Sequence, residues 1–403
     1  MNTLRRLQLR PAIAKGAELK RIRTAIFGTG FMGRVHLEAL RRIEGVDVVA
    51  IVGRELASAQ RLGDGYGIEK FDSDYRNVLR DPNVDAVHIC TPNALHFTMV
   101  KDALLAGKHV LCEKPLSTSI ETAEELVKLA RDRNLRNCVC HNLRYYPMVQ
   151  QMRRMREDGD MGRILMIQGN YLQDWLLDES AWNWRIDSEA GGQLRTMGDI
   201  GTHWFDMAEH VTGLRVRSLC ADLETFYPTR QRPLKNVQAS IAQLSTLPAS
   251  GGEQVAVKTE DFGAVVFQMD EGARGTMTAC QMAAGRKNQL RMEIFGTKAS
   301  LSWNQERPDE LWVGHRDSAN GIYIKDPGLM KEKACSYADL PCGHSEGYDD
   351  TFKQVFRRFY ASIQQPNAPA DYPELVDGLR HMLLMDAQLK SHLSRQWIDV
   401  RGI

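Results

Sequence analysis

Short apolar runs alternate with amphipathic segments through the first third of the chain. The apolar runs are typical of strands buried on both faces of a sheet, and they predict strands at Thr24–Phe27, Val46–Val52, Asp85–Cys90, His109–Cys112 and Asn137–His141. Helical patterns stand between them, at Arg34–Arg42, before Leu104 and at Ile120–Arg133. This alternation predicts βαβ units with right-handed crossovers, and therefore a doubly wound parallel sheet over residues 22–143.

The pattern changes after residue 144. Longer, more alternating segments follow at Arg163–Leu172, Arg215–Thr225, Asp261–Met269, Arg274–Met282 and Gln289–Phe295. Glycine-containing turns separate the last three, which predicts an antiparallel meander with one buried face. Residues 228–254 are interpreted as a long loop, and helices are expected at Ser345–Gln364 and Pro373–Leu393. We expect residues 144–403 to form a second domain, whose last helices can pack back on the first.

The composition of the chain argues against some classes of function. The chain has 403 residues, which favours two or three domains, and 52 basic against 51 acidic residues give a net charge of +1. Such a balance argues against a general nucleic-acid binder. No apolar run is long enough to span a membrane. The expectation is a protein of the cytoplasm without a nucleic-acid or membrane partner.

The N-terminal residues and the cysteines give little information about function. Residues 1–21 are interpreted as a basic tail, because a twin arginine is present but no apolar signal segment follows it. Most of the eight cysteines lie in strand-like segments and read as reduced, buried thiols. Cys342-Gly343-His344 could be half of a metal site, but no second half is evident, so no metal is expected.

A glycine-rich turn follows the first strand and opens the first helix. It reads Gly28-Thr29-Gly30-Phe31-Met32-Gly33, the dinucleotide-binding fingerprint in its required context. Gly28 permits the tight turn, Gly30 lets backbone approach a pyrophosphate, and Gly33 lets the helix pack on the sheet. A Rossmann domain that binds NAD or NADP is therefore predicted, with Phe31 and Met32 among the contacts.

The residues after the second strand bear on the choice of cofactor. An acid there would bind the adenosine ribose, but the strand ends in Gly53-Arg54-Glu55. Gly53 replaces the acid and Arg54 could pair with a 2′-phosphate, which tilts the prediction towards NADP. Glu55 could still reach the ribose, and Arg54 could instead stack on adenine.

Three separated motifs carry candidate chemistry. Glu113-Lys114-Pro115 ends one parallel strand, and Thr91-Pro92-Asn93, with His96 nearby, ends its neighbour. The carboxyl ends of strands are where open α/β sheets bind ligands, so both motifs are predicted to contact the cofactor. A cis bond before Pro115 is possible. Further along, Met197–Asp206 opens a helix in which Asp199 and His203 lie four residues apart and share a face.

Together these residues resemble the Gfo/Idh/MocA oxidoreductase family. The matching pieces are the glycine turn, Thr91-Pro92-Asn93, Glu113-Lys114-Pro115 and Asp199-Ile200-Gly201-Thr202-His203, and the resemblance spans nearly the whole chain. It implies an α/β fold with an N-terminal Rossmann domain and a C-terminal α+β domain whose large, open, mainly antiparallel sheet often mediates oligomerisation. A homo-oligomer, dimer or tetramer, is thus expected. The resemblance also implies that Lys114, Asp199 and His203 form the catalytic set.

The chemistry of these side chains agrees with that implication. Oxidation of a secondary alcohol needs a base for the hydroxyl proton, and a histidine such as His203 suits this role near neutral pH. Lys114 could stabilise developing charge on the same oxygen. Asp199 could orient His203 or bind a second hydroxyl.

The substrate side is less defined. Sugars are commonly held by aromatic faces and polar groups, and the candidates besides Asp199 and His203 are Arg144, Tyr145, Trp175, Trp184, Arg185, Arg286 and His344. For the tryptophans, core packing is an equal alternative. Residues 258–262 and 284–288 resemble the branch with levoglucosan dehydrogenase and glycoside 3-dehydrogenases, which implies oxidation at C3 of a pyranose.

Three functional readings remain open. The first is an NAD(P)-dependent sugar or glycoside dehydrogenase that forms a 3-keto sugar. The second is an enzyme that keeps its nicotinamide bound and uses transient oxidation to cleave or epimerise a glycoside. The third is a non-catalytic dinucleotide-binding regulator, which would be expected to lack Lys114 or His203, whereas both are present.

Overall fold

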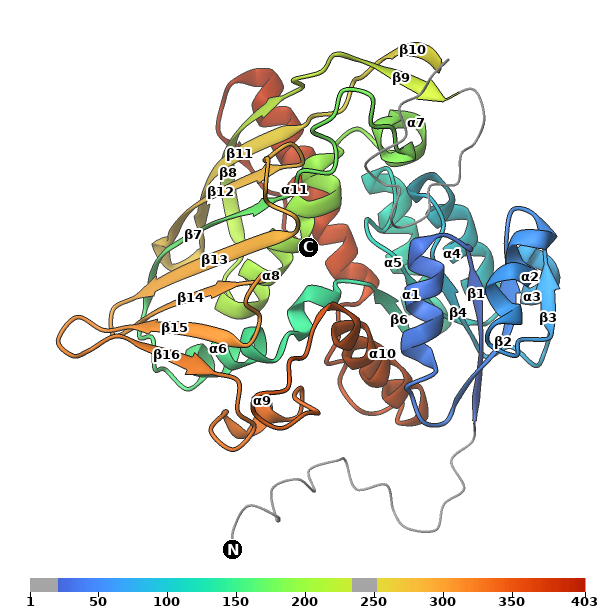
Figure 1. The fold of residues 1–403 in the computed structure, drawn as a ribbon, viewed down its shortest axis with the longest axis horizontal. Helices are drawn as coiled ribbons and strands as arrows, with labels where there is room; N and C mark the ends of the chain where they lie inside the picture. Colours follow the sequence, from blue (N-terminus) through green and yellow to red (C-terminus); the bar gives the residue numbers. More distant parts are fainter. Residues whose placement is uncertain (1–20, 234–251, 403) are drawn as a thin grey trace, which may run out of the picture.

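The computed structural model describes residues 21–233 and 252–402. The predicted basic tail, except for Arg21, lies outside the described residues. Figure 1 shows a parallel sheet flanked by helices on one side of the molecule and a large curved sheet on the other, with helices between them.

The first sheet has the predicted doubly wound topology. Its six strands pair in parallel in the order β3-β2-β1-β4-β5-β6. The strands are β1 Ile22–Phe27, β2 Val46–Val52, β3 Lys70–Asp72, β4 Ala86–Ile89, β5 His109–Cys112 and β6 Asn137–Val139, and the helices are α1 Phe31–Leu40, α2 Leu56–Asp64, α3 Tyr75–Leu79, α4 His96–Leu105 and α5 Ile120–Arg133. The sequence prediction did not include the helices α2 and α3, or the short strand β3, which contains few apolar residues.

The second sheet is mixed, so the prediction of a simple antiparallel meander needs correction. Its nine strands run in the order β16-β15-β14-β13-β7-β12-β11-β8-β17. β7 lies between β12 and β13 and pairs in parallel with β12, while the other pairs are antiparallel. The strands are β7 Ile164–Leu172, β8 Val216–Glu224, β11 Phe262–Met269, β12 Arg274–Cys280, β13 Gln289–Gly296, β14 Ser300–Asn304, β15 Glu310–Gly314, β16 Gly321–Ile324 and β17 Ile398–Asp399.

The interpretation of residues 228–254 as a long loop is also corrected in part. Both ends of this segment are strands, β9 Thr229–Pro233 and β10 Gly252–Ala256, which pair antiparallel. Alternation is weak there because both strands lie near the surface, so the hydrophobic pattern did not reveal them. The residues between them lie outside the described chain.

Helices fill the space between the sheets. α6 Pro147–Glu157, α8 Thr202–Thr212 and α11 Leu375–Ser394 pack on the concave face of the large sheet, whereas α10 Tyr348–Gln364 packs against α1 (Figure 1). The short helices α7 Ser188–Gly191 and α9 Glu332–Cys335 complete the set. Within the residues that the structure describes, no helix combines the length and apolarity that crossing a membrane requires.

α10 shares a hydrophobic core with the Rossmann sheet. Phe352, Phe356 and Phe359 are buried with residues of α1, β1 and β2 in one cluster. The hydroxyl group of Tyr360 lies 2.9 Å from Thr24 Oγ1 on β1. The last part of the chain therefore does pack back on the first domain.

The closeness of α1 to the glycine turn leads to a testable expectation. A Cβ atom on Gly33 would lie 2.0 Å from the carbonyl oxygen of Gly28, whereas a Cβ on Gly65 would meet nothing within 4 Å. Gly33→Ala should therefore lower the free energy of unfolding by about 1–3 kcal/mol or more, because α1 must move away from the sheet. Gly65→Ala is the matched control and should change it little. Urea unfolding of both variants measures the effect, and equal midpoints would contradict this account.

Candidate active site

The glycine turn has the geometry that a pyrophosphate requires. Gly28 has φ of 112°, and a Cβ there would lie 2.5 Å from the carbonyl oxygen of Cys90. Gly30 is different, because nothing would meet its Cβ within 4 Å. It stands at the N-terminus of α1, where no side chain caps the first backbone N–H groups. These groups can therefore bind an anion, as the fingerprint predicts.

Three apolar side chains are exposed around this turn. Phe31, Leu56 and Leu95 are 41%, 46% and 45% exposed, and they follow strands β1, β2 and β4 at the carboxyl edge of the sheet. Exposed apolar groups beside an anion-binding turn suit the flat rings of a dinucleotide. Sequence analysis named only Phe31 of these, because Leu56 and Leu95 belong to no motif. The chain's own residues thus fit a bound dinucleotide.

The surroundings of Gly53, directly after β2, leave no room for a side chain. A Cβ on Gly53 would lie 2.5 Å from Ser58 Oγ and 2.9 Å from Thr29 Cγ2. The next residue, Arg54, is largely exposed, and its guanidinium lies 3.8 Å from the Glu55 carboxylate. Arg54 is therefore the charged group at the site where the ribose-binding acid is expected.

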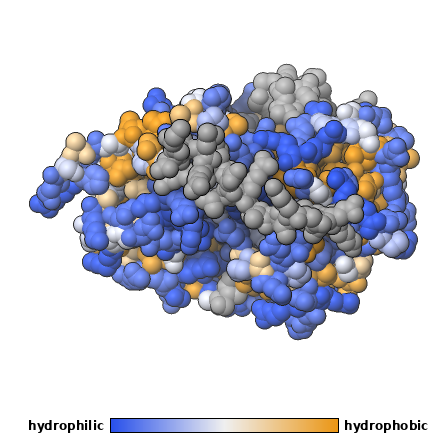
Figure 2. Space-filling view, turned by 90° about the horizontal axis from the view of Figure 1, so that it is seen from below, coloured by the Kyte–Doolittle hydropathy of each residue, from blue (hydrophilic) through white to orange (hydrophobic). Residues whose placement is uncertain are grey.

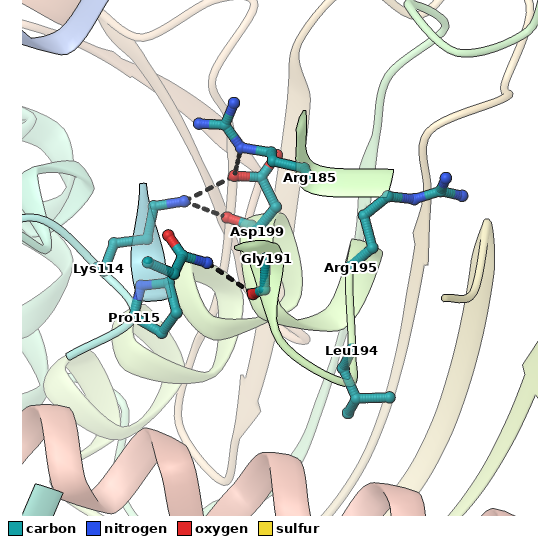
Figure 3. Close-up of a pocket in the computed structure, with 8 residues that line it drawn as sticks. Lys114, Pro115, Arg185, Gly191, Leu194, Arg195 and Asp199 are labelled. Atoms are coloured by element: carbon teal, nitrogen blue, oxygen red, sulfur yellow. Dashed lines mark hydrogen bonds and ion pairs between the residues drawn. The ribbon is translucent and has the colours of Figure 1, made fainter. Parts of the chain in front are cut away.

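Lys114 and Asp199 form the centre of the site (Figure 3). The Lys114 ammonium donates to Asp199 Oδ1 at 2.8 Å and to the carbonyl oxygen of the same residue at 2.6 Å. Arg185 Nε donates to Asp199 Oδ1 at 3.2 Å, and Gln281 Nε2 donates to Oδ2 at 2.9 Å. Sequence analysis missed Gln281 because no motif surrounds it. The peptide bond between Lys114 and Pro115 is cis.

The local turn that carries Asp199 is unusual. Met197–Gly201 is a π-helical turn that continues into α8, a rare conformation that is frequent at functional sites. Asp199 therefore precedes the regular helix in which His203 lies. No hydrogen bond joins Asp199 to His203 among those described, and the Asp199 carboxylate instead contacts Lys114, Arg185 and Gln281.

The charges around Asp199 determine the ionisation of the site. Burial would raise the pKa of Asp199, but the Arg185 and Lys114 cations hold it well below its usual range. Burial, with the Lys114 charge, lowers the pKa of His203 to about 3. His203 is 8% exposed, and its imidazole is therefore neutral at neutral pH. The neutral imidazole has a free lone pair for a proton, and the same burial and Lys114 charge weaken it as a base.

A chain of buried hydrogen bonds supports Lys114 from the Rossmann side. Glu113 Oε2 accepts the Lys114 backbone N–H at 3.2 Å, and Glu113 Oε1 lies 3.0 Å from His36 Nε2. The other ring nitrogen of His36 lies 2.9 Å from His88 Nδ1, and His88 Nε2 lies 2.9 Å from the Tyr360 hydroxyl. Burial would raise the pKa of Glu113, but the bond and charge of His36 lower it overall.

Two residues predicted to contact the cofactor also connect loops. Asn93 Nδ2 donates to the carbonyl oxygen of Gly191 at 2.8 Å, which links the two domains beside Lys114. The ring of His96 is buried, with Nδ1 2.8 Å from the Pro115 carbonyl oxygen and Nε2 2.9 Å from that of Thr91. His96 thus holds the two strand-end loops together.

A small hollow lies at this junction. It is lined by Asn93, Lys114, Pro115, Arg185, Gly191, Leu194, Arg195 and Asp199. Of the predicted substrate residues, Arg185 and Asp199 line it directly. Trp184 lies next to it, because the Arg185 guanidinium stacks 4.5 Å from the centre of its ring.

Three other predicted substrate residues, Arg144, Tyr145 and Trp175, are not among the residues that line the hollow. Arg144 donates to Asp206 Oδ2 at 2.6 Å, and Tyr145 is buried with its hydroxyl on the Asp371 carbonyl oxygen. Trp175 donates to Gln173 at 2.8 Å. The hydrogen bonds of these side chains go to other protein groups, and a role in substrate binding stays a prediction.

The predicted substrate residues Arg286 and His344 also lie outside the hollow. The Arg286 guanidinium lies 3.6 Å from the Glu306 carboxylate, with about half of its side chain exposed. His344 is exposed, and its Nδ1 atom lies 3.2 Å from the carbonyl oxygen of Cys342. Neither is among the residues that line the hollow, and both assignments stay predictions.

Two buried clusters have the side-chain types of a metal site. One contains His36, Glu113 and Cys140, and the other contains His141, Asp206 and His381. In the first, His36 and Glu113 hydrogen-bond to each other. In the second, the Arg144 guanidinium occupies both oxygens of Asp206, and its positive charge disfavours a cation.

Comparisons with known proteins agree with this geometry. Residues 22–141 match the model of the oxidoreductase family described as GFO/IDH/MocA, NAD-binding Rossmann fold. Residues 149–302 match the model of the GFO/IDH/MocA C-terminal domain. The two models cover most of the chain.

Individual relatives carry names of sugar dehydrogenases. Levoglucosan dehydrogenase of Pseudarthrobacter phenanthrenivorans is 31% identical over 399 residues, which are 96% of this chain and 100% of the relative. D-xylose dehydrogenase of Paenarthrobacter nicotinovorans is 30% identical over 233 residues, 55% of this chain and 58% of the relative. A solved levoglucosan dehydrogenase in complex with NADH and L-sorbose has a TM-score of 0.85 and 29% identity, covering 95% of this chain and 100% of that structure.

The low pKa of His203 predicts a dependence of stability on pH. Because the folded-state pKa, about 3, lies below the ordinary 6.5, the unfolded chain binds a proton here more readily. Wild type should therefore lose stability through His203 as the pH falls below 6.5. His203→Gln should remove this contribution and make acid destabilisation less steep. Urea unfolding between neutral and mildly acidic pH tests this, with His315→Gln, an exposed site, as the control. Parallel curves for wild type and His203→Gln would contradict the low pKa.

Proposed function

Because the chain belongs to the GFO/IDH/MocA oxidoreductase family, we propose that it oxidises a secondary hydroxyl of a sugar or glycoside. The acceptor is NAD or NADP and the product a keto sugar. The observation that carries the proposal is the Lys114–Asp199 ion pair of 2.8 Å, held at the carboxyl edge of a dinucleotide-binding sheet beside a neutral, buried His203.

Each side chain of the site has its own role in the proposed alcohol oxidation. When bound, the nicotinamide ring supplies the hydride acceptor. His203 accepts the hydroxyl proton, because its imidazole is neutral and buried. Lys114 donates a hydrogen bond to the same oxygen and stabilises its developing negative charge. Asp199 holds the Lys114 ammonium in place, and Arg185 keeps Asp199 ionised.

A pyranose oxidised at C3 is the substrate we propose within this class. The support is the resemblance of residues 258–262 and 284–288 to the levoglucosan and glycoside 3-dehydrogenase branch, together with the levoglucosan dehydrogenase relative. The flat ring of Trp184 and the polar groups around the hollow suit a neutral polyhydroxylated ring.

The catalytic assignment is tested with a panel of pyranosides. Wild type should reduce the cofactor with at least one of them, and NMR of the product should show a ketone at C3. His203→Gln and Lys114→Met should each lower kcat by about 10²–10⁴-fold. The dissociation constant for the cofactor, measured by fluorescence, should change little in His203→Gln, because His203 is not among the predicted cofactor contacts. Full activity of His203→Gln would refute the mechanism. A cleaved or epimerised product without net cofactor reduction would instead favour transient oxidation.

We further propose that the protein accepts NADP through Arg54. The support is local: Gly53 stands where the ribose-binding acid is expected, and the exposed Arg54 guanidinium, 3.8 Å from the Glu55 carboxylate, can turn towards a 2′-phosphate.

Arg54→Ala should therefore lower kcat/KM for NADP about tenfold and leave that for NAD nearly unchanged, which is the size expected for one lost charge-assisted contact. Arg61→Ala, an exposed arginine on the following helix, is the matched control. An equal loss with both cofactors would assign Arg54 to adenine stacking.

The convex face of the large sheet supports our proposal of a homo-oligomer. The register of the strands puts Met166, Val266, Ile322 and Ile324 on this one face, and each is at least 40% exposed. Figure 2 shows hydrophobic surface beside the projecting connection between β15 and β16. Exposed apolar side chains on one face of a sheet suit contact with a second copy of the chain.

A further inference from the structure

Glu260 lies just before β11 and contacts the start of the catalytic turn. It is 4% exposed. Its Oε2 atom accepts the backbone N–H of Arg195 at 3.0 Å, and its Oε1 atom accepts that of Met197 at 2.8 Å. The first N–H groups of a helix have no partner within the helix. The Glu260 carboxylate therefore supplies the missing acceptor to the turn that carries Asp199.

A second set of contacts joins Glu260 to Asp199. The Thr196 hydroxyl donates to the Glu260 carbonyl oxygen at 2.8 Å and lies 3.2 Å from Gln281 Oε1. The amide group of Gln281 then donates to Asp199 Oδ2 at 2.9 Å. Both the backbone and the carboxylate of the catalytic turn are thus connected to the segment that contains Glu260.

We propose that Glu260 is a positioning residue for the catalytic turn, and that its carboxylate must be ionised to hold Asp199 and His203 in their working arrangement. The inference rests on the proposed function, because it assigns the working arrangement to alcohol oxidation. Glu260 itself does not line the hollow, so it acts through the backbone of residues 195–197.

The chemistry of a carboxyl group supplies the reason. An ionised carboxylate accepts a hydrogen bond on each oxygen, but a protonated one carries an O–H donor on one of them. Protonation therefore leaves either the Arg195 or the Met197 N–H without its partner. Burial raises the pKa of Glu260 to about 7, although both backbone N–H groups oppose this shift. The two forms interchange in the neutral range.

Two arginines, an aspartate and a cysteine lie near Glu260. The Arg195 guanidinium pairs with Asp261, and Arg230 lies 3.8 Å from the same carboxylate. Burial raises the pKa of the Cys280 thiol on β12, which keeps it neutral.

The two titratable groups of the catalytic turn are fixed as well. Asp199 is ionised and His203 is neutral well below pH 7. A transition in kcat near neutral pH is thus assigned to Glu260.

The main test is Glu260→Gln, because a glutamine has the shape and the single acceptor oxygen of the protonated acid. The kcat of wild type should rise through the neutral range as Glu260 ionises. E260Q should remain about tenfold below the wild-type plateau, the order expected for a small misplacement of catalytic groups, and its profile should be flat there. Glu253→Gln, at an exposed position on β10, is the control and should keep the wild-type profile.

A second readout does not depend on activity. The ring resonance of His203, identified by its absence in His203→Gln, should shift near pH 7 in wild type and not in E260Q. The free energy of unfolding should change in the direction opposite to kcat. Because the pKa of Glu260 in the folded state exceeds the ordinary 4.5, wild type should lose stability relative to E260Q as the pH rises from 4.5 to 7.

These outcomes separate the two proposals. If no pyranoside is oxidised but the His203 resonance follows Glu260, the proposed function fails and the positioning role holds. If E260Q is merely less stable and keeps the wild-type pH profile, the positioning role is refuted. If E260Q does not fold, the wild-type titration decides, and a His203 resonance without a shift near neutral pH overturns the inference.

Discussion

The contact between Lys114 and Asp199 joins the parallel sheet to the second domain at the candidate active site. Lys114 ends β5 of the parallel sheet, and Asp199 lies in the π-turn before α8 of the second domain. Their ion pair is nearly buried, with side chains 10% and 16% exposed. A charge in such a place is costly without its partner. The Lys114 charge helps to keep Asp199 ionised and, with burial, His203 neutral.

Each partner of the pair is supported from behind by buried polar groups. On the Rossmann side, Glu113 holds the Lys114 backbone and is itself held by His36. On the other side, Gln281 holds the Asp199 carboxylate. These supporting groups come from distant parts of the chain, so the geometry of the site is a property of the whole fold. Buried networks of this kind are rigid when every member has a partner.

The sequence predicted the parts of the fold that have strong local signals. β2 and α5 match their predicted bounds, and Lys114, Asp199 and Arg185 line one hollow. The position of β7 between β12 and β13 could not be predicted from the sequence, because strand order is set by long-range pairing that leaves no local pattern. Gln281 and the partners of Glu113 were missed for the same reason, since each reaches the site only through tertiary contacts.

The packing of α10 on the Rossmann sheet bears on how the chain is made. During synthesis the N-terminal residues leave the ribosome first and can begin to fold. The apolar surface of α1 and β1, however, is covered by Phe352, Phe356 and Phe359, which are synthesised only after the whole parallel sheet. Part of the core of the N-terminal half therefore stays open to water until α10 has been made.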